Sequence, residues 1–336
     1  MKNLLLFAAT VATLGFAQVS QVPGFPAYAL PTEQLEVLED RGDTVLVRHR
    51  FGETEVPKNP QRVFADAATI ASAVTLGLPV VAGYYWEGTE IIPNWDDQTA
   101  GAALEVSGDY AYNFESVLES DPDLILAFSH IIYSSGDQNF VYEQLSAIAP
   151  TLVLFNDPTE LWFQGLFELS EIFELSEAES NRLAAAGETI AAACQPLQDA
   201  VGDDTVMLIQ PLQGGLWVIG PGFMDNDNFL PYSLTSHLYY FCGLNAPENL
   251  VDFVGTNSGA QMSQELIGDI QADHLFIDTF GGTDAYEEII ASPLWQAVPA
   301  VQKGQVYPIP NLFSGSYDMT LNAIETVTDF ITRGSQ

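Results

Sequence analysis

Residues 176–195, SEAESNRLAAAGETIAAACQ, predict one long helix in the middle of the chain. Ser176 and Glu179 have the spacing of a capping box, in which each side chain bonds the backbone N–H of the other residue at the helix start. Apolar side chains then recur every three or four positions, at Leu183, Ala186, Ile190, Ala193 and Leu197. This is the spacing of one helix face. At 1.5 Å per residue the helix is about 30 Å long.

Short strands and helices alternate on both sides of this helix. Before it, strands are predicted at 44–47, 62–65, 80–83, 123–127 and 151–154, and helices at 67–76, 114–120, 142–149 and 160–173. After it, strands are predicted at 205–209, 216–219 and 274–279. Such alternation is typical of parallel sheets covered by helices. We therefore expect an α/β fold with two similar lobes, 44–158 and 201–336, whose sheets are mainly parallel and which are joined by a helical linker, 159–200.

The two lobes share a pattern of residues at a nearly constant separation. Glu115 precedes Asp123 by eight residues, and Glu265 precedes Asp273 by the same number. The matching residues of the two lobes lie 150 positions apart. Two further matches, 149 positions apart, are Leu145 with Leu294 and Pro150 with Pro299. A constant offset of this kind indicates two lobes built on the same plan.

The charge of the chain restricts its partners. It has 336 residues with 45 acidic and 9 basic side chains, a formal net charge of −36. Nucleic acids and anionic membranes both require clustered Lys and Arg, so we expect neither as a partner. The hydrophobic content of 47% indicates a folded protein rather than a disordered acidic one. Because salt or low pH reduces self-repulsion, we expect a saline or acidic extracytoplasmic setting.

The first residues have the pattern of a secretory signal peptide. Lys2 is followed by a 14-residue apolar run, 4–17, which is shorter than the roughly 20 residues that a membrane-spanning helix needs. Cleavage is predicted after Ala17 or Ala29, within an entry segment that extends to residue 29. Cysteine occurs near neither position. We therefore expect a soluble periplasmic or secreted protein without a lipid anchor.

The two cysteines, Cys194 and Cys242, are too few for a disulfide framework and too far apart for a zinc motif. One structural disulfide and two buried thiols are both compatible with the sequence. The four histidines are scattered, at positions 49, 130, 237 and 274. We expect no cofactor and no resident metal site.

Several segments, in this order, resemble the substrate-binding proteins of ABC importers for iron siderophores and cobalamin. The first is RHRFGETEVP at 48–57, followed by PQRV at 60–63. A helix-then-strand signature follows in FESVL at 114–118 and DPDLI at 121–125, and then YEQLSAIAPT at 142–151. The C-terminal signature comprises LWQAV at 294–298, AV at 300–301 and GQVY at 304–307. The resemblance extends roughly from residue 47 to the end of the chain.

This resemblance implies two α/β lobes joined by the long helix, a ligand held in the cleft between them, and little hinge closure. It also implies a partner, an ABC permease with its ATPase. In this family one glutamate on each lobe meets arginines of the permease, and the matching residues here are Glu115 and Glu265. A helix dipole also favours glutamate in a first turn, so both explanations of these residues are open.

Candidate ligand-binding residues follow from the predicted strands, because ligands of open α/β sheets bind beyond the carboxyl ends of the strands. The segments predicted there are rich in aromatic side chains, which suit a large amphipathic ligand. The candidates are Tyr84, Tyr85, Trp86, His130, Tyr133, Trp217, Phe223, Phe280 and Phe313. Core packing near strand ends is the alternative explanation for about half of them, and Trp217 fits either.

The same segments contain no lysine or arginine. Catecholate siderophore complexes are strongly anionic and are bound through such residues. We therefore predict a ferric siderophore of hydroxamate type as the ligand. We also expect the protein to be a monomer. One alternative is haem or cobalamin, with His130 or Tyr133 available to haem iron. A second is a secreted hydrolase with paired carboxylates. The usual nucleophile-elbow and phosphate-loop motifs are absent from the sequence, which favours a binding protein over an enzyme.

Overall fold

The computed structural model describes residue 25 and residues 35–66, 68–85, 99–106, 112–128, 132, 136–154, 162–225, 228–231, 237–279, 284–309 and 317–334. The chain forms two compact units. The N-terminal unit comprises Thr32–Ala184 with Gly315–Met319, and the C-terminal unit comprises Ala185–Ser314 with Thr320–Gln336. Among the described residues, no helix combines the length and the apolar character needed to cross a membrane.

The N-terminal unit is built on a parallel five-stranded sheet with the order β6-β5-β4-β7-β8. Its strands are β4 (Val63–Asp66), β5 (Val80–Tyr85), β6 (Ala103–Val106), β7 (Leu124–Phe128) and β8 (Thr151–Leu154). Every residue of β4 and β8 is buried, which is why these strands read as continuous apolar runs rather than as alternating ones.

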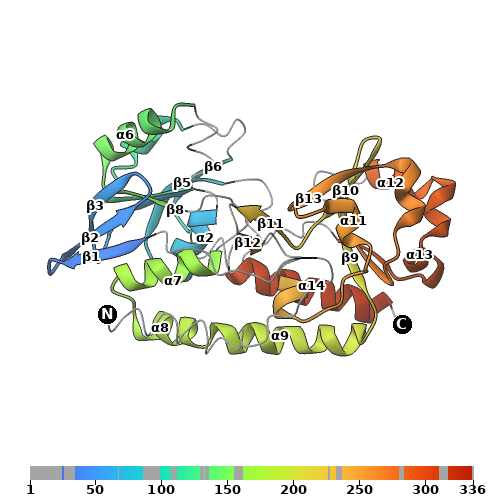
Figure 1. Cartoon of the computed structure of the whole chain (residues 1–336). Helices are drawn as coiled ribbons and strands as arrows, with labels where there is room; N and C mark the ends of the chain where they lie inside the picture. Colours follow the sequence, from blue (N-terminus) through green and yellow to red (C-terminus); the bar gives the residue numbers. More distant parts are fainter. Residues whose placement is uncertain are drawn as a thin grey trace. The chain divides into compact units, whose positions relative to one another are not determined.

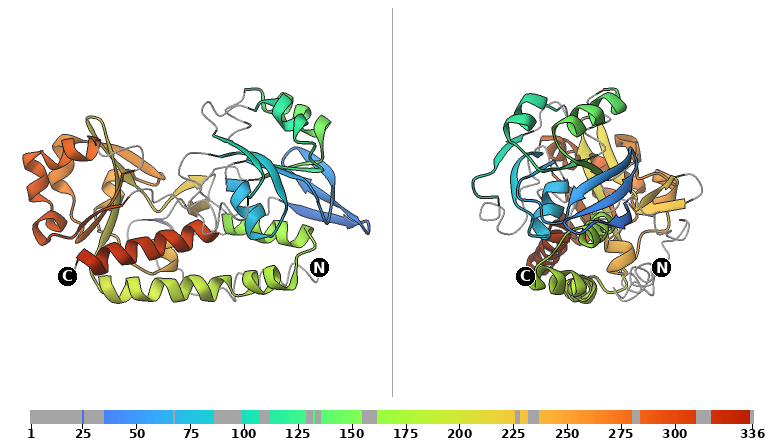
Figure 2. Two further views of the ribbon diagram at one scale, coloured as in Figure 1. Left: turned by 180° about the vertical axis from the view of Figure 1, so that it is seen from behind. Right: turned by 90° about the vertical axis from the view of Figure 1, so that its left-hand side faces the viewer.

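Helices cover both faces of this sheet. They are α2 (Ala68–Thr75), α4 (Phe114–Glu119), α6 (Gln138–Ile148) and α7 (Trp162–Ile172), and α8 (Glu177–Ala184) follows α7. α6 lies on one side of the sheet, and α2 and α7 lie on the other (Figures 1 and 2). A second, antiparallel sheet of three strands packs beside β8 and comprises β1 (Glu36–Asp40), β2 (Thr44–His49) and β3 (Gly52–Pro57).

The C-terminal unit has a five-stranded sheet with the order β13-β10-β9-β14-β15. Its strands are β9 (Val206–Leu212), β10 (Gly215–Ile219), β13 (Gly259–Ser263), β14 (His274–Asp278) and β15 (Val306–Ile309). β4 and β9 are the central strands of the two sheets. On one side, β5 and β6 correspond to β10 and β13, and on the other side, β7 and β8 correspond to β14 and β15. The two units are therefore variations of one plan.

The remaining elements of the C-terminal unit surround this sheet. They are α9 (Ala186–Val201), the hairpin β11 (Gly222–Asp225) and β12 (Asn228–Pro231), η2 (His237–Phe241), α11 (Leu250–Val254), η3 (Gln264–Asp269), α12 (Asp284–Ile290), η4 (Pro293–Ala297), α13 (Pro299–Lys303) and α14 (Tyr317–Gly334). α9 and α14 lie side by side (Figures 1 and 2). The first turn of α14, Tyr317–Met319, is grouped with the N-terminal unit.

The prediction of a parallel sheet holds for the first unit and is only partly right for the second. β14 pairs in parallel with β9 and β15, but β10 pairs antiparallel with β9 and β13. Two residues, Gln213 and Gly214, connect β9 to β10. A connection this short can make only a hairpin, because parallel neighbours need a crossover of a dozen or more residues.

The linker is helical, as predicted, but it differs in detail from a single helix over 176–195. The capping box is present: Ser176 N–H donates to Glu179, and Glu179 N–H donates to the Ser176 hydroxyl. A turn at Ala185, next to the helix-weakening Gly187, separates α8 from α9. α9 then continues through Pro196 to Val201, because the burial of Leu197 and Val201 offsets the hydrogen bond that proline removes.

The two cysteines form a disulfide, which decides between the two possibilities that the sequence left open. Cys194 on α9 is bonded to Cys242, which directly follows η2, and their Cα atoms are 5.0 Å apart. Both residues are buried. The bond therefore fixes α9 to the segment after η2 inside the C-terminal unit.

An aspartate carboxylate joins the amino ends of the two central strands in each unit. In the N-terminal unit, Asp123 before β7 accepts hydrogen bonds from the N–H groups of Gln61 (2.7 Å) and Arg62 (2.9 Å), just before β4. In the C-terminal unit, Asp273 before β14 accepts from the N–H (2.9 Å) and the hydroxyl (2.8 Å) of Thr205, just before β9. These are the aspartates that lie 150 residues apart in the sequence, and they have the same role.

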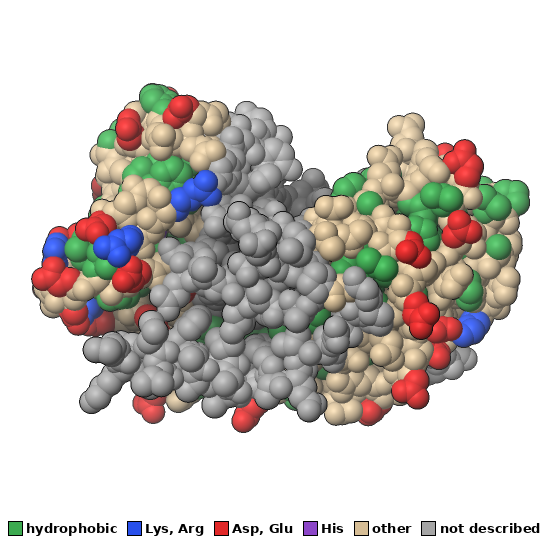
Figure 3. All heavy atoms as spheres, viewed as in Figure 1, with side chains coloured by type: hydrophobic (Ala, Val, Ile, Leu, Met, Phe, Trp, Pro, Cys, Tyr) green, Lys and Arg blue, Asp and Glu red, His purple; other side chains and the backbone are tan. Residues whose placement is uncertain are grey.

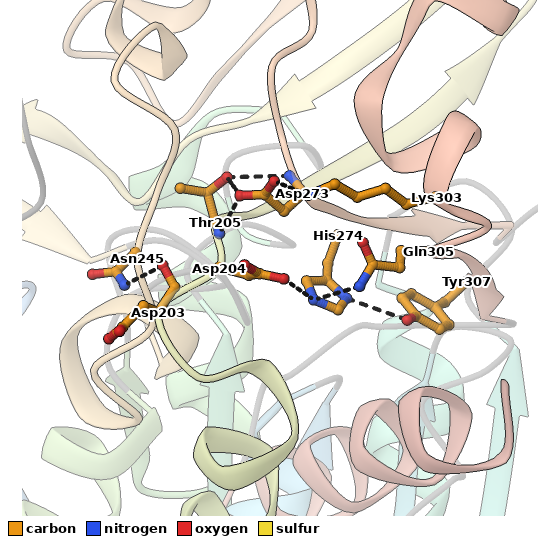
Figure 4. Close-up of polar contacts among 9 residues, drawn as sticks. All are labelled: Asp203, Asp204, Thr205, Asn245, Asp273, His274, Lys303, Gln305 and Tyr307. Atoms are coloured by element: carbon orange, nitrogen blue, oxygen red, sulfur yellow. Dashed lines mark hydrogen bonds and ion pairs between the residues drawn. The ribbon is translucent and has the colours of Figure 1, made fainter. Parts of the chain in front are cut away.

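The second of these aspartates belongs to a larger polar cluster (Figure 4). Lys303, at the end of α13, places its ammonium 2.6 Å from Asp273. The Lys303 ammonium and the Thr205 N–H together lower the pKa of Asp273 to about 2. Beside it, buried His274 lies 3.2 Å from the Tyr307 hydroxyl and 3.4 Å from Asp204, and its burial lowers its pKa. All of these groups lie at the amino ends of the strands, the end opposite to the expected ligand edge.

We predict that Asp273→Asn lowers the stability of the C-terminal unit in a pH-dependent way. The pKa of Asp273 is lower in the folded protein than its unfolded value of 3.8. Its contribution is therefore complete above about pH 4 and is lost as the pH falls toward 2. Because the side chain is 27% exposed, we expect a loss of roughly 1–2 kcal/mol at pH 7 in chemical unfolding.

The control for this measurement is Asp252→Asn, at an exposed aspartate of α11. It is expected to leave the unfolding free energy within about 0.5 kcal/mol of the wild type. A loss in Asp273→Asn that stays constant between pH 4 and pH 2 would show that the charged Asp273 carboxylate does not stabilise the fold.

We also predict that removing the disulfide destabilises the protein. Its loop spans 48 residues, and closing a loop of that size is worth about 2–4 kcal/mol through the entropy of the unfolded chain. The double variant Cys194→Ala/Cys242→Ala should lose this amount in guanidinium unfolding, and reducing agent should shift the wild type but not the variant. Equal unfolding midpoints for reduced and oxidised wild type would show that the bond contributes nothing.

Candidate functional site

The carboxyl ends of the parallel strands in the N-terminal unit carry a buried polar group, Asp66. It is the last residue of β4 and is fully buried. The turn that follows it is closed by Thr69, whose hydroxyl bonds the Asp66 backbone and the carbonyl oxygen of Leu126 on β7. This arrangement fixes the direction in which the chain leaves the sheet.

Two tyrosines connect this edge of the sheet to the start of α4. The Tyr112 hydroxyl donates a hydrogen bond to the Asp66 carboxylate. Tyr84, beside Asp66 on β5, has its hydroxyl between the backbone N–H (3.1 Å) and carbonyl oxygen (3.2 Å) of Asn113. The two rings pack edge to face at 6.0 Å, and burial raises the pKa of Tyr84. Residues 112 and 113 are thus held by buried side chains on both sides.

The segment held in this way begins the helix that carries Glu115. The Asn113 side chain caps α4 by accepting from the N–H groups of Glu115 and Ser116. Val117 points into the core, while Glu115 is exposed. The capping fixes the helix start, so the Glu115 carboxylate is presented to solvent from a backbone that cannot shift freely.

Glu265 occupies the corresponding position in the C-terminal unit. It lies in the first turn of η3, directly after β13, and it is exposed. The Ser263 hydroxyl and the residue's own backbone N–H hold the pKa of Glu265 below its usual value. Ile267, two residues later, is buried, just as Val117 is in α4.

The structure describes four of the nine predicted ligand-binding residues at least in part. Tyr84 is buried and bonds the backbone, whereas Tyr85, the last residue of β5, is half-buried. Trp217 lies in β10, and Phe223 lies in β11, where only its backbone is described. Trp86, His130, Tyr133, Phe280 and Phe313 lie outside the described residues. Sequence reasoning missed Tyr112, although it precedes the Asn-Phe-Glu helix start by one residue.

Trp217 is positioned by a close approach between two strands. Its neighbours Leu216 and Val218 are buried on one face of β10, so its half-buried side chain points to the other face. The indole lies over Gly259 on β13, where an added Cβ would be only 2.2 Å from the Trp217 Nε1 atom. Glycine at this position leaves the space that the ring occupies.

The described basic side chains form ion pairs and hydrogen bonds with neighbouring groups, away from the carboxyl ends of the strands. Ion pairs on the three-stranded sheet join Arg41 to Glu39 and Glu55, Arg48 to Glu36 and Glu53, and Lys58 to Asp40. Most of the Lys and Arg side chains visible in Figure 3 lie over this sheet, with acidic side chains beside them. Arg62 bonds the carbonyl oxygens of Ser120 and Asp121 at the end of α4.

The remaining basic residues that the structure describes also have partners. Arg182 on α8 pairs with Asp318, Arg333 pairs with Asp329 on α14, and Lys303 pairs with Asp273. Arg50 lies against the ring of Phe51 in the turn between β2 and β3. Because the whole chain has only nine basic residues, little positive charge is left for a ligand.

The three histidines in the described part of the chain belong to different elements. His49 ends β2 and bonds Thr54 and Tyr142, His237 begins η2, and His274 begins β14. Within the described residues, no group of three or more His, Cys, Asp or Glu side chains is arranged to hold a metal ion.

Comparison with known proteins adds an independent line of evidence. No family model matches the chain. The iron(3+)-hydroxamate-binding protein FhuD of Bacillus subtilis is 26% identical over 296 residues, which cover 86% of each chain. The ferric enterobactin-binding periplasmic protein FepB of Escherichia coli is 25% identical over 275 residues, or 77% of this chain and 81% of that protein.

A solved structure shows the same fold. It is a FhuD-fold periplasmic binding protein from a Fep/Fec-like ferrichrome ABC transporter of Bacillus subtilis, with a TM-score of 0.67 and 23% identity over 84% of this chain and 98% of that one. The similarity runs through both units and the helical linker. The chain is therefore similar in sequence to siderophore-binding proteins and has the FhuD-type fold, in agreement with the sequence resemblance.

Proposed function

We propose that this protein is the extracytoplasmic substrate-binding component of an ABC importer and captures a ferric siderophore for delivery to a permease. The observation that carries the proposal is the similarity over 86% of the chain to an iron-hydroxamate-binding protein, together with the shared fold. Its homologues are substrate-binding proteins, and we propose accordingly that the protein binds its ligand without transforming it.

The distribution of charge supports a hydroxamate-type complex over a catecholate one. The segments that follow β5, β7, β8, β14 and β15 contain no lysine or arginine, and the described basic side chains are used elsewhere. A strongly anionic complex would find no cationic partner there and would be repelled by the acidic chain. Neutral or cationic ferric hydroxamates avoid this cost.

Aromatic side chains at the carboxyl ends of the strands are proposed as the ligand contacts. Tyr85, Trp86, His130, Tyr133, Phe280 and Phe313 are the proposed first contacts. Phe223 is not included, because β10 runs antiparallel to β9 and the segment after β10 therefore begins at the amino end of β9. Trp217 fits this role because its ring lies on the half-buried face of β10. Tyr84 fits a supporting role, because its hydroxyl is already bonded to Asn113.

We further propose that the signal peptide is removed after Ala17 or Ala29 and that the mature monomer carries no lipid anchor. Both cleavage positions lack a nearby cysteine. Mass spectrometry of the exported protein gives the position of the new N-terminus directly.

We predict that the protein binds ferrioxamine B or ferrichrome, one per chain, and binds ferric enterobactin at least 100-fold more weakly. Titration followed by quenching of tryptophan fluorescence measures all three, with haem and cobalamin as further ligands. Trp86→Ala is expected to weaken hydroxamate binding, because an aromatic wall excludes water from the complex. Tight binding of enterobactin, haem or cobalamin alone would disprove the proposed ligand class.

Glu115 and Glu265 are proposed as the residues that dock the protein onto its permease. They are exposed, lie at equivalent places in the two units, and each sits in the first turn of a helix whose next buried residue anchors it in the core. Because the helix starts hold the backbone of these residues, binding to arginine side chains would cost little backbone freedom. Such pairs set the orientation and rate of encounter more than the affinity.

We predict that Glu115→Arg/Glu265→Arg abolishes uptake in proteoliposomes that contain the permease and ATPase, while ligand affinity is unchanged. Reversal of two charges in so acidic a protein also changes its bulk charge, so the matched control is Glu53→Arg/Glu188→Arg, at two other exposed glutamates. Equal impairment of both double variants would assign the effect to bulk charge and reject specific docking.

A further inference from the structure

The exposed apolar side chains of this protein are concentrated near the two proposed docking glutamates. In the part of the chain that the structure describes, seven large apolar side chains are exposed: Val37, Leu118, Phe140, Leu266, Ile290, Leu294 and Phe330. Single exposed apolar residues are normal in a folded protein. Their grouping is informative, because four of the seven lie on the glutamate-bearing helices or on the elements packed against them. A fifth, Ile290, ends the helix that is hydrogen-bonded to Gln264.

In the N-terminal unit these residues are Leu118 and Phe140. Leu118 lies three positions after Glu115 on α4, so the two side chains share one helix face, and Leu118 is 60% exposed. α6 packs against α4, and Phe140 is exposed in its first turn. Glu115 therefore shares a helix face with an exposed leucine, and the neighbouring helix carries an exposed phenylalanine.

The C-terminal unit also has exposed apolar side chains next to Glu265 in the sequence and on the adjoining elements. Leu266, the next residue, is 44% exposed. η3 packs against η4, and a Cβ added at Gly268 would lie 3.9 Å from the Cβ of the exposed Leu294. The Gln264 side chain bonds Glu288 on α12 (2.7 Å), the helix that ends in exposed Ile290. Figure 3 shows apolar side chains among acidic ones over this part of the unit.

We propose that each docking contact is a glutamate set in an apolar surround, and that it fits a permease surface presenting an arginine flanked by apolar side chains. We define the docking patches as Glu115 with Leu118 and Phe140, and Glu265 with Leu266, Ile290 and Leu294. This inference rests on the proposed function and specifies the kind of surface that the partner presents.

The physical reason lies in the weakness of an exposed ion pair. Such a pair contributes about 0–1 kcal/mol and is screened by salt. In a chain with 45 acidic residues, charge alone would also let a permease arginine meet many wrong carboxylates. Apolar neighbours that are buried on docking exclude water from the pair and strengthen it. They therefore distinguish these two glutamates from the rest of the acidic surface.

The test measures binding to the permease and ATPase held in lipid nanodiscs and immobilised for interferometry, so that it does not depend on the ligand. The patch variant is Leu118→Ser/Leu266→Ser, and a second one is Phe140→Ser/Leu294→Ser. The matched control is Val37→Ser/Phe330→Ser, which changes side chains of 40% and 36% exposure on β1 and α14. We expect each patch variant to bind at least tenfold more weakly, with an unchanged melting temperature, and the control to bind like the wild type.

The outcomes separate this inference from the proposed function. If Glu115→Gln/Glu265→Gln weakens binding and both patch variants match the control, docking depends on charge alone and the inference is wrong. If the glutamate and patch variants all bind like the wild type, the docking proposal itself fails. Sedimentation that shows a dimer of the wild type, lost in the patch variants, would assign the patches to a second copy of this chain and overturn the inference.

Discussion

The arrangement of each unit depends on one interaction at the amino edge of its sheet, the bond between an aspartate carboxylate and the backbone N–H that precedes the first central strand. Asp123 and Asp273 make this bond at the amino ends of β7 and β14. A carboxylate accepts such bonds strongly because it is charged. It also fixes the register of the two central parallel strands at their start, and a register shift of one residue would turn every side chain to the wrong face. The carboxyl ends of the same strands lie at the opposite edge of each sheet.

At the carboxyl ends of the strands in the N-terminal unit, buried polar groups position an exposed one through hydrogen bonds. Asp66 and Tyr84 bond Tyr112 and the Asn113 backbone, and Asn113 in turn caps the helix of Glu115. The exposed carboxylate is therefore linked to the sheet by a short series of hydrogen bonds. In the C-terminal unit a simpler connection has the same effect, because η3 follows β13 directly. Rigid placement matters for a docking residue, since a mobile side chain would lose conformational entropy on binding.

The strong negative charge has two consequences that act together. Most of the few basic residues are used in local ion pairs, chiefly on the β1–β3 sheet. The segments beyond the strand ends are consequently without positive charge, which limits the class of ligand. The same acidic surface makes charge a poor means of identifying any one site. We propose that shape and apolar contact supply this specificity, through the aromatic candidates for the ligand and through the docking patches for a permease.

The sequence by itself determined the α/β alternation, the helical linker and the repeated pairs Glu115/Asp123 and Glu265/Asp273, because hydrophobic period, capping residues and spacing are local properties of the chain. It could not determine that β10 turns back on β9, that the linker breaks at Ala185, or that Cys194 meets Cys242. Tyr84 illustrates the difference at the site: its place at a strand end was predictable, whereas its bond to Asn113 arises from residues 29 positions apart. Such contacts depend on how the elements pack, and only the tertiary structure brings together residues that are distant in the chain.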